Sequence, residues 1–130
     1  MKTKNLKVET NSQKYSIIIG SNLISSIKKI TNTNSLNFRK CLLVVDHNIS
    51  KKIVLKIKKS FNKKEIFTYF FKANEINKNL NNVNKILDIL LRKNFSREDC
   101  LISIGGGITG DVAGFSASLF KRGLKFINIP

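Results

Sequence analysis

Hydrophobic and polar positions in the N-terminal part of the chain predict a hairpin followed by a helix. Short apolar or alternating runs at 6–9 and 15–20 are separated by polar residues, as in two antiparallel strands. Leucine and isoleucine then recur at helical spacing over 23–30, where the preceding Ser21 or Asn22 can cap a helix. The polar stretch 31–37 is expected to be a loop.

From residue 40 onward, strand and helix patterns alternate. Continuous apolar runs are typical of buried parallel strands, and apolar residues three and four apart are typical of amphipathic helices. The expected strands are 40–45, 66–71, 100–104 and 125–129, and the expected helices are 49–61, 80–93 and 108–120. This alternation predicts an α/β fold with a Rossmann-like parallel sheet, flanking helices on both faces and an N-terminal β-hairpin, all in one domain, 1–130.

Composition narrows the possible partners of this domain. The net charge is +16, but the lysines are spread along the whole chain together with many asparagines and isoleucines, as in a general compositional drift. Only four arginines occur, and no stretch interleaves basic with aromatic residues as RNA-stacking surfaces do. We therefore expect no nucleic-acid partner, although a basic surface would attract phosphorylated small molecules.

Localisation follows from the apolar runs and the N-terminus. No run approaches the ~20 residues that a membrane span needs, and the first residues lack the apolar region of a secretory signal. Cys41 and Cys100 sit inside apolar runs, where cysteine acts as a small hydrophobe. We expect a cytoplasmic protein with no membrane partner.

Three consecutive glycines, Gly105 to Gly107, stand between a predicted strand and a predicted helix. In doubly wound folds such a turn lets backbone N–H groups approach a diphosphate, and the helix N-terminus adds positive charge. The spacing is neither that of the usual dinucleotide fingerprint nor that of a Walker A loop. A tight turn, with close helix–sheet packing at Gly114, is the structural alternative. The small residues Ala113, Gly114, Ala117 and Ser118 are expected on one side of that helix.

The longer string around these glycines is more specific. The segment GGGITGDVAGFSASLFKRGLKFINIP resembles the signature of the 3-dehydroquinate synthase family. Upstream, VVDHN, the E-x-x-K segment EINK and the opening YSIIIGSNL resemble the same family in the same order. In this family and its superfamily of sugar-phosphate cyclases, an N-terminal α/β domain binds NAD and a C-terminal helical domain carries the metal. The resemblance implies that residues 1–130 are the NAD-binding domain, truncated before the helical metal-binding domain.

The resemblance also assigns cofactor-binding residues. Asp46 and Asn48 would hold the adenosine side of NAD, and the alternative is that they cap the helix at 49–61. Glu75 and Lys78 would contact the ribose and phosphates, and the alternative is a capping pair before the helix at 80–93.

In the glycine segment, Gly106 and Gly107 would lie against the diphosphate and Asp111 would lie on the nicotinamide ribose side. An acid in the first helical turn is also favourable with the helix dipole alone. Arg122 would reach a substrate site across a dimer interface, and its alternative is a stabilising cation at a helix C-terminus.

The implied activity is conversion of 3-deoxy-D-arabino-heptulosonate 7-phosphate to 3-dehydroquinate and phosphate in the shikimate pathway. NAD is the implied cofactor, and a homodimer is expected for the full-length protein. The single histidine, His47, cannot form a metal site alone, so zinc or cobalt is expected only with the missing domain. We assign no catalytic residue to this chain and expect the isolated chain to be inactive.

Two alternatives remain open. One is another sugar-phosphate cyclase or an NAD-dependent polyol dehydrogenase. The other is a non-catalytic basic module that binds nucleotides or RNA.

Overall fold

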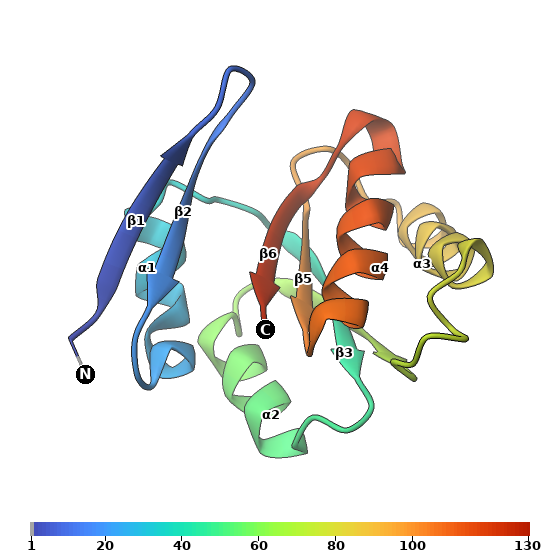
Figure 1. Ribbon diagram of the computed structural model, residues 1–130, viewed down its shortest axis with the longest axis horizontal. Helices are drawn as coiled ribbons and strands as arrows, with labels where there is room; N and C mark the ends of the chain where they lie inside the picture. Colours follow the sequence, from blue (N-terminus) through green and yellow to red (C-terminus); the bar gives the residue numbers. More distant parts are fainter. Residues whose placement is uncertain (1) are drawn as a thin grey trace.

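The parallel sheet predicted from residue 40 onward is the centre of the fold. The computed structural model describes residues 2–130 and has a four-stranded sheet of order β4-β3-β5-β6, with every neighbouring pair parallel (Figure 1). Its strands are β3 (Lys40–Asp46), β4 (Glu65–Phe71), β5 (Cys100–Ile104) and β6 (Lys125–Ile129). All four lie within one or two residues of their predicted bounds.

Helices cover both faces of this sheet. On one face, α3 (Leu80–Arg92) and α4 (Gly107–Leu119) bury Ile86, Leu90, Val112 and Ala113 against the strands. On the other face, α2 (Lys51–Ser60) and α1 (Ile27–Thr33) bury Ile27, Val54 and Ile57. The two cores use alternate residues of β3, because successive side chains of a strand point to opposite faces. The predicted α/β architecture with helices on both faces is confirmed.

The predicted hairpin is also present. Strands β1 (Lys4–Glu9) and β2 (Lys14–Ile19) pair antiparallel, with Leu6 opposite Ile17, and form a separate two-stranded sheet. Figure 1 shows this hairpin beside the main sheet, not joined to it.

The first helix differs from its prediction in two ways. It begins as a 3-10 turn, η1 (Leu23–Ser26). Asn22 has a left-handed conformation with φ 55° and makes no side-chain capping bond, and Ser26 makes none either. It then continues to Thr33 within the expected loop, where the Thr31 hydroxyl donates to the carbonyl of Lys28. A buried threonine that bonds its own helix is compatible with continuing the helix.

The last helix packs closely on the edge strand β6. A Cβ at Gly114 would lie 3.3 Å from the Phe126 ring, so the helix can approach only with a small residue there. Of the small residues expected on one side of this helix, Ala113 and Ala117 are buried and Gly114 is half-buried, but Ser118 is exposed and Ser116 is buried instead. The Ser116 hydroxyl is satisfied by donating to the Val112 carbonyl at 2.7 Å. Among residues 2–130, no helix has the length and apolar character needed to cross a bilayer.

Candidate functional site

The site predicted from the sequence lies at the carboxyl edge of the sheet, where the order of strands reverses. From β3 the chain moves to β4 on one side, and it later returns through α3 to β5 on the other side. Such a reversal leaves a crevice between the ends of the two central strands, where ligands of open α/β sheets bind. Asp46 ends β3 at this crevice, and Gly105 follows β5.

Gly105 is the most tightly packed glycine of the turn. Its φ is +151°, and an added Cβ would lie 2.8 Å from Asp46 Cβ and 2.9 Å from Thr109 Oγ1. The Gly105 N–H donates to the Ile129 carbonyl at 3.0 Å, which ties the turn to β6. Only glycine fits this position without a shift in its surroundings.

Gly106 and Gly107 have free space around them, whereas Gly105 is tightly packed. Apart from its chain neighbours and the nearby backbone of its own helix, no heavy atom lies within 4 Å of a Cβ built at either position. Gly106 is the N-cap of α4 and has no side chain to bond the helix, so the first-turn N–H groups lack a side-chain partner from that residue. The turn therefore presents backbone donors and a helix N-terminus toward free space, as a phosphate cradle requires.

Asp46 is held within its own turn, not at a helix end. Its Oδ1 accepts the Asn48 N–H at 3.2 Å and lies 3.1 Å from His47 Nδ1. The helix α2 is capped by Ser50, whose Oγ accepts the Lys52 N–H at 3.2 Å. The alternative that Asp46 or Asn48 caps this helix is therefore wrong, and the second carboxylate oxygen of Asp46 has no partner within residues 2–130.

Lys78 and Asp111 form an ion pair that links the β4–α3 loop to the second turn of α4. The expectation that Asp111 lies in the first helical turn is wrong, because α4 begins at Gly107 and its first turn has no acid. Lys78 Nζ lies 2.9 Å from Asp111 Oδ2. This hydrogen bond, then the charge of Asp111 and more weakly that of Glu75, raises the pKa of Lys78. Asn79 caps α3 by accepting the Asn82 N–H at 3.0 Å, so the alternative of a Glu75–Lys78 capping pair is wrong. The loop thus carries Glu75 and Lys78 to the same end of the sheet as the glycine turn.

Three polar residues near the glycine turn were not among the predicted site residues. Thr109 is fully buried and its hydroxyl has no hydrogen-bond partner. Ser103 on β5 donates its hydroxyl to Asn128 Oδ1 on β6, and that same oxygen lies 3.0 Å from a Cβ built at Gly110. A serine inside an otherwise apolar strand was the available sequence signal for Ser103, whereas nothing local distinguishes Asn128.

Arg122 lies apart from the other predicted residues. It ends the 3-10 turn η2 (Phe120–Arg122) with φ 67°, at the opposite end of α4 from the glycine turn. The structure therefore gathers Asp46, the glycines, Lys78 and Asp111, but not Arg122, at one edge of the sheet. Within residues 2–130, no group of three or more His, Cys, Asp or Glu side chains is placed to hold a metal ion.

A family profile and the curated relatives indicate the same family. A family profile described as "3-dehydroquinate synthase N-terminal" matches residues 68–130. A 3-dehydroquinate synthase of Pelagibacter ubique (strain HTCC1062) is 59% identical over 125 residues, which are 96% of this chain and 34% of that protein. The chain spans about one third of the length of the curated relatives it matches.

Solved structures share the fold. A 2-deoxy-scyllo-inosose synthase, complexed with carbaglucose-6-phosphate, NAD+ and Co2+, has a TM-score of 0.85 at 20% identity, over 98% of this chain and 34% of that one. A 2-epi-5-epi-valiolone synthase from Streptomyces hygroscopicus subsp. jinggangensis 5008, with NAD+ and Zn2+ bound, has a TM-score of 0.64 at 22% identity, over 72% of this chain and 27% of that one. These likenesses place the hairpin and the parallel sheet in a known α/β architecture.

Proposed function

The chain belongs to the 3-dehydroquinate synthase family, and from that premise we propose that it is the NAD-binding domain of an enzyme that makes 3-dehydroquinate. The proposed substrate is 3-deoxy-D-arabino-heptulosonate 7-phosphate, which loses its phosphate in the reaction. The observation that carries the proposal is the open glycine turn beside Asp46 at the reversal of the strand order.

The residues at this edge fit a dinucleotide. Gly106 and Gly107 leave room for a diphosphate against backbone N–H groups, and Gly105 brings the turn close to Asp46. The free oxygen of Asp46 can accept from a ribose hydroxyl, which is a charge-assisted hydrogen bond. The buried Thr109 hydroxyl, unpartnered in the described residues, is a further polar group beside the same crevice.

Bound NAD would supply reversible oxidation of a substrate carbinol, and a divalent metal, zinc or cobalt, would polarise the oxygen involved. The role of this chain is to bind NAD and to orient it. Asp46 and Asn48 hold the adenosine side, Gly106 and Gly107 hold the diphosphate, and Asp111 faces the nicotinamide ribose. Glu75 and Lys78 close over the ribose and phosphates from the neighbouring loop.

The proposal extends to the complete enzyme. Residues 2–130 offer no cluster of metal ligands. The metal would therefore be bound by residues of the complete enzyme that correspond to the part of the relatives that this chain does not cover. In a full-length homodimer in the cytoplasm, Arg122 would bind the substrate of the partner subunit. We expect no turnover by the 130 residues alone, and steady formation of 3-dehydroquinate by the purified chain would overturn that expectation.

NAD+ binding to the purified chain, measured by calorimetry, tests the proposal. We expect Asp46→Asn and Asp111→Asn to weaken binding about tenfold, because each removes a charge from a hydrogen bond to the cofactor. Asp88→Asn is the matched control, since Asp88 is also an exposed helical aspartate in an ion pair, 3.1 Å from Arg92. It should leave the Kd unchanged.

Two outcomes would contradict the proposal. One is an absence of NAD+ binding by a chain whose melting curve shows that it is folded. The other is equal weakening by Asp88→Asn and Asp111→Asn, which would mean that general charge, not the site, controls binding. RNA binding that falls steeply with salt, without NAD+ binding, would instead favour the non-catalytic basic module.

A further inference from the structure

The amino edge of the sheet, where β3 to β6 begin, carries a row of exposed cations. Each strand is preceded within three residues by one of them: Lys63 before β4, Arg39 before β3, Arg97 before β5 and Arg122 before β6. Within residues 2–130 none of these four side chains forms an ion pair or a hydrogen bond. Neighbouring strands are about 4.8 Å apart, so the row follows the strand order across the whole edge.

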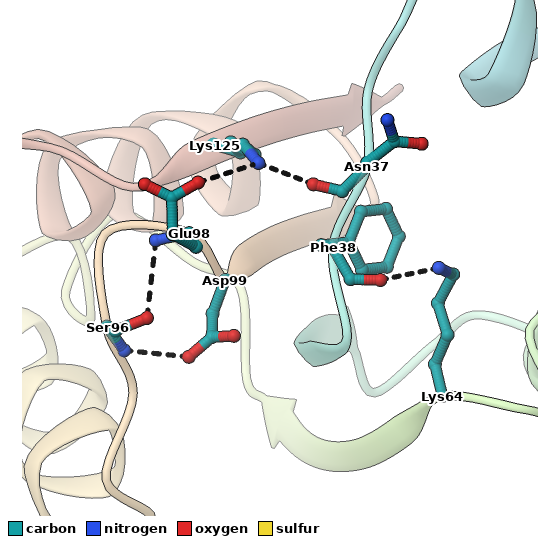
Figure 2. A network of polar contacts seen from close by, with 7 residues as sticks. All are labelled: Asn37, Phe38, Lys64, Ser96, Glu98, Asp99 and Lys125. Carbon is teal, nitrogen blue, oxygen red and sulfur yellow. Dashed lines mark hydrogen bonds and ion pairs between the residues drawn. The ribbon is translucent and has the colours of Figure 1, made fainter.

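Other lysines at this edge have a structural role. Lys40 Nζ donates to the Lys93 carbonyl at 2.8 Å, and Lys121 Nζ donates to the Phe95 carbonyl at 2.9 Å. Figure 2 shows Lys64 Nζ bonded to the Phe38 carbonyl and Lys125 Nζ between the Asn37 carbonyl and Glu98. These ammonium groups satisfy carbonyls of the loops at this edge.

A pocket of about 460 Å³ opens at this same edge. It is lined by Arg39, Lys40, Lys63, Glu65, Asn94, Ser96 and Asp99.

Several lining groups are already occupied. The buried Asp99 carboxylate accepts the Ser96 N–H at 2.7 Å (Figure 2), and Lys40 is bonded to carbonyls. The Arg39 guanidinium, the Lys63 ammonium and the Glu65 carboxylate have no such partner within residues 2–130. The pocket therefore offers two free cations and one free carboxylate.

We propose that this amino-edge pocket binds a small phosphate ester that carries hydroxyl groups. Arg39 can bond a phosphate in a bidentate manner, and Lys63 adds a point charge. The Glu65 carboxylate accepts from hydroxyl groups of the same ligand and disfavours a bare polyanion. A single-stranded nucleic acid fits less well, because Phe38 and Phe95 at this edge are buried and offer no stacking surface.

The site does not depend on the proposed NAD site, which lies at the opposite edge of the sheet. The experiment is an NMR titration of the ¹⁵N-labelled chain with ribose 5-phosphate and, separately, with inorganic phosphate, at constant ionic strength. We expect amide shifts at Asn94, Ser96 and Glu65 with both probes. Ribose 5-phosphate should bind more tightly, and Glu65→Gln should remove most of that advantage.

Matched variants distinguish the pocket from general charge. Arg39→Gln and Lys63→Gln should each weaken binding of ribose 5-phosphate about tenfold. Arg97→Gln removes the same charge from the same edge but outside the pocket lining, and it should change the Kd less than twofold.

Three results would overturn the proposal. The first is equal weakening by Arg97→Gln and Arg39→Gln, which would indicate diffuse electrostatic binding. The second is a set of shifts confined to the amides of residues 105–108, which would assign the phosphate to the glycine turn. The third is an absence of any shift with either probe. The first and third results leave the NAD proposal untouched, and the second would support it, so failure of this proposal is distinguishable from failure of the NAD proposal.

Discussion

The conformation of Gly105 makes it the residue at which a single methyl group should matter most. Gly105→Ala would place Cβ 2.8 Å from Asp46 Cβ at a φ of +151°, which L-residues rarely adopt. We expect this variant to lose about 2 kcal/mol of unfolding free energy, measured by urea denaturation.

Gly107→Ala is the control for that substitution. The space around Gly107 is empty and the residue begins a helix, so alanine should be neutral or stabilise the chain by about 0.5 kcal/mol. Equal losses at the two positions would mean that the close contacts and the positive φ of Gly105 do not set the cost.

The buried thiols give a pH dependence. Cys41 and Cys100 are opposite each other on β3 and β5, and both are fully buried. Burial raises the pKa of Cys41 to about 12, against a weaker lowering by Lys64, and burial raises the pKa of Cys100 further. The unfolded thiols release their protons near pH 8.5 while the folded ones keep them. Stability is therefore complete below that pH and falls as the pH rises toward about 12.

We expect this fall to approach about 1.4 kcal/mol per pH unit for each thiol. Urea denaturation at several pH values between 8 and 10 measures it. The double variant Cys41→Ala/Cys100→Ala retains every other titrating group and should show a shallower fall. If the unfolding free energies of the two proteins fell in parallel with pH, the thiols would contribute nothing to the pH dependence.

Among the helices, α3 depends on the cap that Asn79 provides. The side-chain Oδ1 of Asn79 accepts the Asn82 N–H, and its side-chain Nδ2 donates to the Ile76 carbonyl at 2.8 Å. Asn79→Ala should lower the unfolding free energy by about 1 kcal/mol. Asn81→Ala, an exposed change within the same helix, should be neutral or slightly stabilising, and thermal melts of both variants measure the difference. Equal destabilisation by Asn79→Ala and Asn81→Ala would mean that the Asn79 cap does not stabilise α3.

The strands and long helices were predictable because their hydrophobic periods are strong. The run 40–45 is continuously apolar after Lys40, and 80–93 repeats its apolar residues at helical spacing. The helix starts were less predictable, since several polar residues precede each helix and any of them can cap it. Ser50 and Asn79 cap α2 and α3, and the choice depends on backbone conformation, which the sequence does not display.

The candidate site was predictable only in part. The glycine turn and Asp111 carry a local signal, because three glycines next to a helix are unusual. The contact of Lys78 with Asp111 joins residues of two different elements, so no local pattern contains it. Thr109 lies near Gly105, and Asn128 lies near Gly110 and Ser103. These contacts form only when α4 packs on β5 and β6. The amino-edge pocket likewise combines residues from three separate segments.

The net charge of +16 affects the stability of the entire chain. Like charges repel more strongly in the folded state, and salt screens them over a Debye length of about 10 Å at 0.1 M. We expect the melting temperature to rise as NaCl increases from 20 to 300 mM, by roughly 4 °C for each kcal/mol of repulsion removed. A melting temperature that falls with salt would mean that attractive ion pairs dominate.

The bond from the Gly105 N–H to the Ile129 carbonyl has a consequence for biosynthesis. A ribosome releases the chain from its N-terminus, so β1 to β5 and α4 leave the exit tunnel before β6 does. Until Ile129 emerges, the turn lacks its anchor, and the side chain of Ser103 lacks its partner Asn128. The glycine turn should therefore be the last part of this chain to take shape during translation, after the sheet that supports it has begun to fold.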